Sequence, residues 1–592
     1  MATRLVASSP LCSFIKFQPV KAPSQKYSSN ASFPKPVFRC VATSTTEVIE
    51  RRSGNYQPCI WDIEFLQTVD SDYSKEIYKK RSENLKRQVK TMLVSEVEPL
   101  VQLELIDVLQ RLCLGYEFET EIKSILQSIY NNNSSSSGKY KSSQDLHAAA
   151  LEFRLLRQHH YIVPQEIFES FRDENGFKKS IYDDVKGMLS LYEASFFAFE
   201  DESIMEEAWE FTSEKLKSLK TEDMDPTLAM LVPHALEIPL HWRLPRFDAR
   251  WFIEVYEKSR DMNPILLELG KLDFNIVQSM YQEDLRVMSS WWKEIALREK
   301  LDFARDRLVP SYLWGVGVSS EPQYAYSRRI IGMDIAIINM IDDIYDIYGT
   351  LEEVELFTDA VKKWDINAMK QLPDYMKIAY LAFYNTVNEM IYVILKEHGV
   401  DVTDHLTKAW LGLLNGYLTE ARWYHTKHKP SLAEYMKNAC MSIAGPLIAT
   451  LAYLTTHKSI TEEEMKYLET IPDVMHWTSY VFRISDDYGT SSDELKRGDV
   501  PKAIQCYMHD SGVSEEEARL HMRKLVRNGW KKVNKYRFME SQESPLTPTL
   551  VEMMQNLTRV SQNLYEHGDG HGIEDGETKD RVLRLLFQPI PM

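Results

Sequence analysis

The sequence predicts an all-α protein with two helical domains, and three observations lead to this fold class. From residue 74 onward, apolar residues recur at three- and four-residue spacing, the period of an amphipathic helix, as in Ile77–Leu100. Few stretches alternate between apolar and polar residues, as a half-buried strand would. A turn signal at Asn263-Pro264 precedes a long amphipathic run, Ile265–Leu297, so we place a domain boundary near residue 265.

The helical runs are separated by residues that break helices. A polar, Asn- and Ser-rich stretch over residues 131–138 is expected to form a surface loop. Further breaks are expected at Pro164, around Pro226 and Pro233, and at Pro239 and Pro245. In the C-terminal half, Ser442-Ile443-Ala444-Gly445-Pro446 interrupts a helical run; a Gly-Pro step there predicts either a packing kink or free carbonyls aimed at a cation.

Composition excludes several classes of protein. The 592 residues include 44% hydrophobic residues, which rules out wholesale disorder, and the formal charge of −17 with no long basic stripe argues against a nucleic-acid partner. Six scattered Cys without a CxxC pair support neither a disulfide framework nor a zinc site. The apolar run Ile330–Ile341 is interrupted by Asp334 and Asn339, so it predicts a buried helix and not a membrane span.

The charge is unevenly distributed along the chain. Residues 1–46 carry six Lys or Arg and no Asp or Glu, so this segment is +6 and the remainder is −23. The same segment holds eight Ser and five Pro and no apolar run long enough for a secretory signal. Such a leader is typical of an organellar transit peptide; the alternative is a disordered basic tail.

The first chemical signal is the string Asp342-Asp343-Ile344-Tyr345-Asp346, which ends the apolar run Ile330–Ile341. On a helix, Asp342 and Asp346 project side by side, and Asp343 is rotated by about 100°. Paired carboxylates at the end of an apolar helix are costly unless a cation lies between them. Mg²⁺ prefers such a set, completed by water and phosphate oxygens. The alternative interpretation is a solvated helix end.

A second signal lies about 140 residues further on. Asp486, Thr490 and Glu494 are spaced i, i+4, i+8 and would form one oxygen-bearing stripe along a helix, with Arg483 one turn earlier. Alone, this pattern is equally compatible with a polar helix face. Together with the first motif, it predicts the opposite wall of a trinuclear metal site.

Basic residues suited to a diphosphate accompany both motifs. Arg305 and Arg307 precede the first carboxylate motif, and Lys502 follows the second in the run Gly498–Lys502. Arg captures phosphate oxygens with two N–H groups, and Lys supplies a point charge. Each of these residues alone is more often a surface residue; their place beside the carboxylates makes them candidates.

These motifs, in this order and spacing, resemble those of plant terpene synthases of the angiosperm monoterpene synthase subfamily. Arg51-Arg52, followed after eight residues by Trp61, adds to the resemblance, which covers residues 47–592. It implies a plastid transit peptide over residues 1–50 with cleavage near Arg51 and a stromal enzyme. It also implies an N-terminal relic α/α-barrel over 51–265 and a C-terminal class I terpenoid synthase α-bundle over 266–592. No DxDD acid motif is present, so class II activity is not expected.

The activity that the resemblance implies is metal-dependent ionisation of geranyl diphosphate by three Mg²⁺ or Mn²⁺ ions, followed by rearrangement or cyclisation of the carbocation to a monoterpene olefin or alcohol. We expect a monomer without a membrane span. The metal ligands would be Asp342, Asp346, Asp486, Thr490 and Glu494. The diphosphate would be bound by Arg305, Arg483 and Lys502, with Asp343 supporting a basic residue. The carbocation pocket would include Trp314, Tyr417, Tyr565 and His571, and the N-terminal cap Arg51, Arg52 and Trp61.

Two alternatives and two departures from the family pattern accompany this interpretation. A prenyl diphosphate synthase would need a second DDxxD motif, and a non-catalytic helical scaffold would merely bind divalent ions. Tyr488 stands where the family usually has an aliphatic residue, outside the ligand register, and Asp486 stands where many relatives have Asn. Whether His571 or the released diphosphate takes the final proton stays open at this stage.

Overall fold

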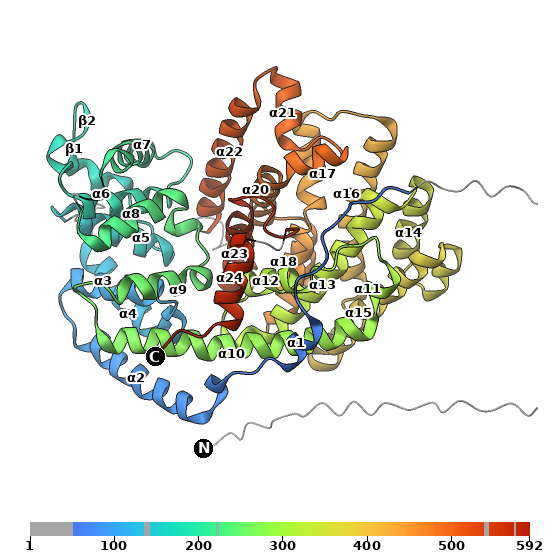
Figure 1. Cartoon of the computed structure of the whole chain (residues 1–592). Helices are drawn as coiled ribbons and strands as arrows, with labels where there is room; N and C mark the ends of the chain where they lie inside the picture. The colour runs from blue at the N-terminus through green and yellow to red at the C-terminus, as the bar shows by residue number, and fades with distance from the viewer. Residues whose placement is uncertain (1–50, 135–142, 221, 223, 538–543, 574–575) are drawn as a thin grey trace, which may run out of the picture. The chain divides into compact units, whose positions relative to one another are not determined.

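The computed structural model describes residues 51–592 apart from 135–142, 221, 223, 538–543 and 574–575 (Figure 1). The predicted transit peptide therefore lies outside the described residues. Arg51–Met592 form one compact unit, and the described part of it is almost wholly helical. Its one small sheet is the antiparallel pair β1 (Arg172–Asp173) and β2 (Gly176–Phe177). The all-α prediction is confirmed.

The helices that precede residue 264 form the N-terminal part of this unit. Their bounds are α1 Ile63–Thr68, α2 Glu76–Ser95, α3 Pro99–Arg111, α4 Glu119–Asn133, α5 Leu146–Gln158, α6 Val185–Ser195, α7 Ser203–Ser218, α8 Pro226–Glu237 and α9 Pro245–Tyr256.

The helices of the C-terminal part begin with the longest one. Their bounds are α10 Pro264–Ile295, α11 Leu297–Lys300, α12 Leu308–Val318, α13 Ala325–Asp343, α14 Leu351–Lys363, α15 Asp374–His398, α16 Thr403–Thr426, α17 Leu432–Ser442, α18 Gly445–Thr456, α19 Glu462–Glu469, α20 Asp473–Arg497, α21 Ala503–Ser511, α22 Glu515–Lys535, α23 Pro548–Tyr565 and α24 Gly576–Val582. The π-helical turns η8 (Ile344–Tyr348) and η11 (Leu583–Phe587) also belong to this part.

Several of the predicted breaks coincide with the starts of helices. Pro226, Pro245 and Pro264 each occupy the first turn of a helix, where the missing N–H costs nothing. Two expectations were wrong: Pro233 lies inside α8 and not at a break, and Ile77–Leu100 is not a single helical run. Helix α2 ends at Ser95 and α3 starts at Pro99, because a proline disfavours helical backbone in the residue before it.

Helix α10 joins the two parts of the chain. It starts at the turn where we placed the boundary: the Asn263 side chain accepts hydrogen bonds from the backbone N–H of Ile265 and Leu266 and caps the helix. Along its length it packs on α1, α2 and α9 from the N-terminal part and on α12 and α13 from the C-terminal part. A helix of this length can therefore bury one continuous face against both sets of helices.

The C-terminal helices that carry the motifs close on themselves. Helix α12 packs on α13, α13 on α18, α18 on α20, α20 on α23, and α23 back on α12, with α16 against α18. The α12–α13 crossing is tight, since a Cβ built on Gly315 would lie 2.3 Å from the carbonyl oxygen of Arg328. This closed bundle holds the two carboxylate motifs on α13 and α20.

Two segments of the described residues are long and apolar enough to pass a test for membrane spans, Asp374–His398 and Leu432–Thr456. The first is α15, one face of which packs on α13. The second is broken at Ala444, whose φ of 63° separates α17 from α18. This break was predicted from Ser442–Pro446. Apolar helices of a bundle core pass the same test, so these segments are weak evidence for a membrane span.

Candidate active site

The first carboxylate motif lies where α13 changes its winding. The α-helix ends at Asp343, and Ile344–Tyr348 continue as the π-helical turn η8. Such turns are rare and often occur at functional sites. Asp342 and Asp346 are partly exposed, and Asp343 is buried with 1% exposure. The motif therefore presents two accessible carboxylates and turns the third inward.

Arg305 binds the motif from the segment before α12. Its backbone N–H donates to Asp343 Oδ2 at 2.7 Å, and its Nε lies 2.9 Å from Asp343 Oδ1. Its guanidinium also hydrogen-bonds Asp342. Asp343 thus has a basic partner, Arg305, which is itself a candidate diphosphate ligand.

The second motif lies in the C-terminal half of the regular helix α20, where the spacing predicts a single stripe. Asp486 accepts from Arg483 Nη1 at 3.0 Å, and the Thr490 hydroxyl donates to the Asp486 carbonyl oxygen at 3.0 Å. Glu494 lies 3.8 Å from the buried Lys502 Nζ. Two carboxylates of this motif, Asp486 and Glu494, therefore each have a basic side chain as a neighbour.

Two buried acids that the sequence analysis did not select hold these cations in place. Asp487 accepts from the Tyr435 hydroxyl (3.0 Å), from Arg483 Nη1 (3.3 Å) and from the Ala503 N–H (2.9 Å). Glu420 on α16 lies 3.8 Å from Lys502 Nζ and accepts a hydrogen bond from Asn438 Nδ2 at 3.1 Å. The position of Asp487 beside Asp486 was a usable signal; Glu420 stands alone on an apolar helix and gave none.

The electrostatics of the two motifs favour a cation between them. Burial raises the pKa of Asp486 to about 7, and the nearby Glu494 adds to the rise. Burial and the neighbouring Asp342 raise the pKa of Asp346 well above its usual range. Glu494 Oε2 is buried without a hydrogen-bond partner. An orphaned carboxylate oxygen beside acids with raised pKa values is the donor chemistry that a divalent metal satisfies.

The residues therefore fit divalent metal ions, although they do not form a closed cage. Within the described residues, no group of three or more His, Cys, Asp or Glu is gathered tightly enough to hold an ion by itself. This spacing fits ions that are bound by one or two carboxylates from each wall and whose remaining ligands are phosphate oxygens.

The N-terminal segment lies over the first motif. Arg51 makes a two-pronged ion pair with Glu353, 2.8 Å for each nitrogen, and donates to the Tyr348 carbonyl oxygen at 2.8 Å. Arg52 donates to the carbonyl oxygen of Asp346 at 2.8 Å and to Asp499 Oδ1 at 2.6 Å. Arg52 thus links the first motif to the segment that follows α20.

Trp61 was expected in this cap together with the two arginines. It lies instead in the hydrophobic core with 7% exposure, and its ring centroid is 5.6 Å from that of Phe587. A large aromatic ring next to an apolar cluster is best buried, so Trp61 anchors the far end of the segment.

Two further residues connect distant segments at the site: Arg307, which the sequence analysis named beside Arg305, and Tyr56, which it did not select. Arg307 donates to the carbonyl oxygens of Gln57 (2.9 Å) and Gly572 (3.0 Å), so it ties the N-terminal segment to the loop after α23. The Tyr56 hydroxyl hydrogen-bonds Asp343, and the Arg305 guanidinium lies 5.0 Å from the Tyr56 ring centroid. The two contacts of Arg307 join residues that are 250 and 265 positions apart, so no local sequence pattern reveals them.

The predicted pocket aromatics are buried, and three of them lie together. The Trp314 ring is 6.1 Å from Tyr565 and 6.2 Å from His571, and the Tyr565 hydroxyl hydrogen-bonds Asp486. Tyr417 lies apart from these three, on α16, 5.8 Å from the Tyr345 ring of the first motif. Three of the rings therefore lie together near Asp486 of the second motif, and Tyr417 lies beside the first motif.

His571 is held as a neutral ring. The Trp314 indole can only donate, so His571 Nδ1 accepts its N–H at 3.2 Å. Nε2 must then carry the proton, which it donates to Asn339 Oδ1 at 3.0 Å. Burial and the nearby Arg305 and Arg307 lower the pKa of His571 to about 3. Its only free lone pair is thus already used.

An all-α bundle with two facing carboxylate motifs and buried Arg and Lys beside them defines a metal-dependent enzyme of diphosphate chemistry. Residues 293–532 match the metal binding domain of the terpene synthase family, and residues 60–236 match the N-terminal domain of terpene synthases. The chain belongs to the terpene synthase family. It is a carbon–oxygen lyase that acts on phosphates and depends on a divalent metal.

Among curated relatives, (-)-alpha-terpineol synthase of Vitis vinifera is 52% identical over 96% of this chain and 95% of its own length. The chloroplastic myrcene synthase of Quercus ilex is 50% identical over the full length of both chains. A solved limonene synthase with 2-fluorolinalyl diphosphate is 44% identical, with a TM-score of 0.89 over 92% of this chain and 100% of the other. Isoprene synthase of grey poplar (Populus x canescens), in complex with three Mg²⁺ ions and dimethylallyl-S-thiolodiphosphate, is 42% identical, with a TM-score of 0.82 over 90% and 99%.

Proposed function

We propose that this chain is a plastidial monoterpene synthase that ionises geranyl diphosphate and converts the carbocation to a ten-carbon olefin or alcohol. One observation carries the proposal: carboxylates of both motifs interact with the same buried cation, Lys502. Lys502 pairs with Glu494 of the second motif, and its charge also acts on Asp346 of the first. Names of similar proteins, terpineol, myrcene and limonene synthases, support the ten-carbon product.

The residues that would hold the metal are Asp342, Asp346, Asp486, Thr490 and Glu494. When bound, three Mg²⁺ or Mn²⁺ ions would neutralise the diphosphate and so favour breakage of the C–O bond. The three Mg²⁺ ions in the isoprene synthase structure support this number. Metal charge on the carboxylates would weaken their hold on the paired cations, because each carboxylate then has a second positive partner.

Arg305, Arg483 and Lys502 would bind the departing diphosphate. Each of them forms an ion pair with a carboxylate of one motif, with N···O distances of 2.9 to 3.8 Å. The pairs are Arg305–Asp343, Arg483–Asp486 and Lys502–Glu494. The negative charge that develops on the leaving oxygens is stabilised most by donors that are already placed and desolvated. Asp343 and Asp487 keep the two arginines oriented and do not need to touch substrate.

The carbocation would lie between the aromatic rings, where π-faces stabilise positive charge and water is excluded. Trp314 and Tyr417 would supply such faces, and Tyr565 is held by Asp486. The N-terminal segment, fixed by Arg51 and Arg52, would cover the site. Because His571 is neutral with its Nδ1 lone pair occupied, the released diphosphate is the better acceptor of the final proton.

The domain organisation belongs to the same proposal. Residues 1–50 would be a transit peptide removed near Arg51, residues 51–265 a helical domain without class II activity, and residues 266–592 the catalytic domain. The chloroplastic names of several relatives support targeting to the plastid, with the stroma as the working compartment. The enzyme would act as a monomer.

The test is to incubate the purified full-length chain with Mg²⁺ and, separately, with dimethylallyl, geranyl and farnesyl diphosphate, and to identify products by gas chromatography. We expect volatile ten-carbon products from geranyl diphosphate at the highest kcat/KM. Preferred turnover of another diphosphate would contradict the assigned substrate. Longer diphosphates formed in the presence of isopentenyl diphosphate would indicate a prenyl transferase, and no turnover at all a metal-binding scaffold.

A further inference from the structure

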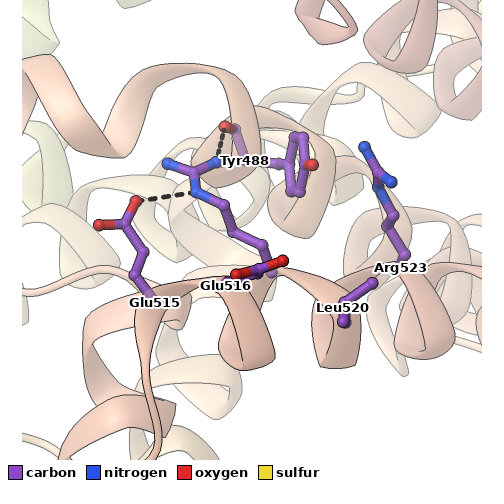
Figure 2. Close-up of a pocket in the computed structure, with 6 residues that line it drawn as sticks. Tyr488, Glu515, Glu516, Leu520 and Arg523 are labelled. Carbon is purple, nitrogen blue, oxygen red and sulfur yellow. Dashed lines mark hydrogen bonds and ion pairs between the residues drawn. The ribbon is translucent and has the colours of Figure 1, made fainter.

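Tyr488 follows the buried Asp487 on α20 and faces away from the carboxylate stripe. It lies about 200° around the helix from Asp486, on the side that packs against α22. Its ring lies against two arginines of α22: the guanidinium carbons of Arg519 and Arg523 are 5.0 and 5.3 Å from the ring centroid (Figure 2). The turn of α20 that carries the motif is therefore held from behind by cation–π contacts.

Arg519 holds the same turn through its hydrogen bonds. Its Nη1 donates to the Tyr488 carbonyl oxygen at 3.0 Å, and its Nη2 donates to the Ser492 hydroxyl at 2.9 Å. Its Nε donates to Glu515 Oε1 at 2.8 Å, which fixes the guanidinium plane (Figure 2). Residues 488 and 492 are one turn apart, and Thr490 and Glu494 interleave with them, so one side chain fixes the turn that presents two of the proposed ligands.

An open surface pocket borders this part of the contact between α20 and α22. A cavity of about 390 Å³ is lined by the following residues: Tyr488, Glu515, Glu516, Arg519, Leu520 and Arg523. Apolar side chains also pack the two helices here, since the buried Ala518 and Met522 of α22 belong to the apolar cluster against which Tyr488 packs. The contacts of Arg519 with the Tyr488 ring and backbone thus add to this apolar packing at the turn that carries the motif.

Helix α22 is itself anchored, so it can serve as a fixed support. Toward its C-terminal end, Arg527 and Lys531 both form ion pairs with Glu206 of α7. The Arg527 guanidinium also lies 3.8 Å from the Trp209 ring centroid. These contacts connect α22 to the N-terminal helices.

We propose that Tyr488 is a positioning residue that sets the metal affinity of the second motif by clamping its helical turn to α22. The inference rests on the proposed function, in which Asp486, Thr490 and Glu494 hold metal. Side chains behind the ligands commonly tune metal binding without touching the ion, because they fix where the ligands point. The ring face carries this role, so the hydroxyl is dispensable.

The test compares Tyr488→Leu with the matched control Tyr488→Phe in the full-length chain. Two readouts are taken against Mg²⁺ concentration: the rise in unfolding temperature in the presence of inorganic diphosphate, and kcat with geranyl diphosphate. We expect Tyr488→Leu to raise the Mg²⁺ concentration for half-maximal response by about tenfold in both readouts, while kcat at saturating Mg²⁺ is largely kept. Tyr488→Phe should stay within about twofold of the unsubstituted chain, because it keeps the ring between the arginines.

Two results would overturn the inference. One is an unchanged Mg²⁺ requirement in Tyr488→Leu, whether or not its unfolding temperature without Mg²⁺ falls. The other is an equal shift in Tyr488→Leu and Tyr488→Phe. Asp486→Ala separates this failure from that of the proposed function, because it should abolish the Mg²⁺-dependent stabilisation. If Asp486→Ala kept that stabilisation, the ligand set itself would be wrong and the inference would fall with it.

Discussion

The two carboxylate motifs carry similar chemistry but are supported in different ways. The first lies at the end of α13 in a π-helical turn and is held by segments distant in sequence: Arg52 binds the Asp346 carbonyl oxygen, and Arg305 binds Asp342 and Asp343. The second lies within the regular helix α20, supported from behind by α22. One wall thus depends on the N-terminal segment and the other on packed helices.

This difference assigns different roles to the walls. A segment attached mainly by arginine side chains can leave and return at modest cost, because partly exposed ion pairs contribute little stability each. Buried Asp487, with three hydrogen bonds from α17, α20 and α21, cannot rearrange without exposing an unpaired charge. We therefore expect the first wall to close over substrate and the second to serve as a fixed platform.

Removal of a first-wall ligand should have the largest effect on activity. Asp342→Ala and Asp346→Ala should each lower kcat by about 10²–10³-fold or more, because the charge that develops on the diphosphate loses metal stabilisation. Both side chains are partly exposed, so the fold should persist. Steady-state kinetics and circular dichroism together measure this, and near-normal product formation by either variant would contradict the metal assignment.

Asp487→Ala should instead destabilise the platform. It leaves Arg483 with one fewer partner and strands the Tyr435 hydroxyl and the Ala503 N–H in the interior, at a cost of about 3 kcal/mol in the free energy of unfolding. Urea denaturation followed by circular dichroism measures this cost. Asp510→Ala is a suitable control, since Asp510 is an exposed acid near the same helices whose side chain accepts from the Leu432 N–H. Equal stability of both variants would argue against the platform.

The sequence predicts local features well and distant contacts poorly. The stripe of Asp486, Thr490 and Glu494 follows from helical spacing alone, and the starts of α8, α9 and α10 follow from proline chemistry. The break before Pro99 was readable by the same rule and was overlooked. The contacts of Arg307, in contrast, join positions 250 and 265 residues apart, so they depend on how the helices pack.

The same reason explains which site residues could not be found. Glu420 can be recognised as a site residue only when the fold places α16 beside Lys502. Tyr56 can be recognised only when the N-terminal segment is placed beside Arg305. The aromatic residues of the pocket were found by resemblance to a family and not from the residues themselves. Trp61 shows the limit of that route, because it anchors the segment from the core and does not lie beside Arg51 and Arg52 at the first motif.

The pH dependence of stability tests whether His571, in the loop after α23, is neutral in the folded protein. His571 has a folded-state pKa of about 3, far below its ordinary value, because of burial. Below the unfolded-state pKa of about 6.5, His571 is protonated in the unfolded chain but stays neutral in the folded chain. The folded state therefore loses stability as the pH falls. The loss from this residue should be about 2 kcal/mol between pH 6.5 and pH 5.

His571→Gln isolates this contribution, because glutamine cannot titrate there but can still hydrogen-bond. Its urea midpoint should fall less between pH 6.5 and pH 5 than that of the unsubstituted chain. His241, another buried histidine whose pKa burial lowers well below its usual range, titrates in both proteins and so cancels in the comparison. An identical pH dependence of the two proteins would show that His571 is not held neutral.

The smallest effect should come from the contact that joins the two walls. Arg52→Ala removes the hydrogen bonds to the Asp346 carbonyl oxygen and Asp499, while Arg51 still attaches the segment to Glu353. We expect about a tenfold fall in kcat, since residues that orient metal ligands commonly contribute this much, and little change in unfolding temperature. Water should also reach the carbocation more often, so the ratio of alcohol to olefin in the product should rise. Arg52→Lys keeps the charge but cannot reach both acceptors, and an intermediate product ratio in this variant would show that the geometry of the cap, and not its charge, excludes water.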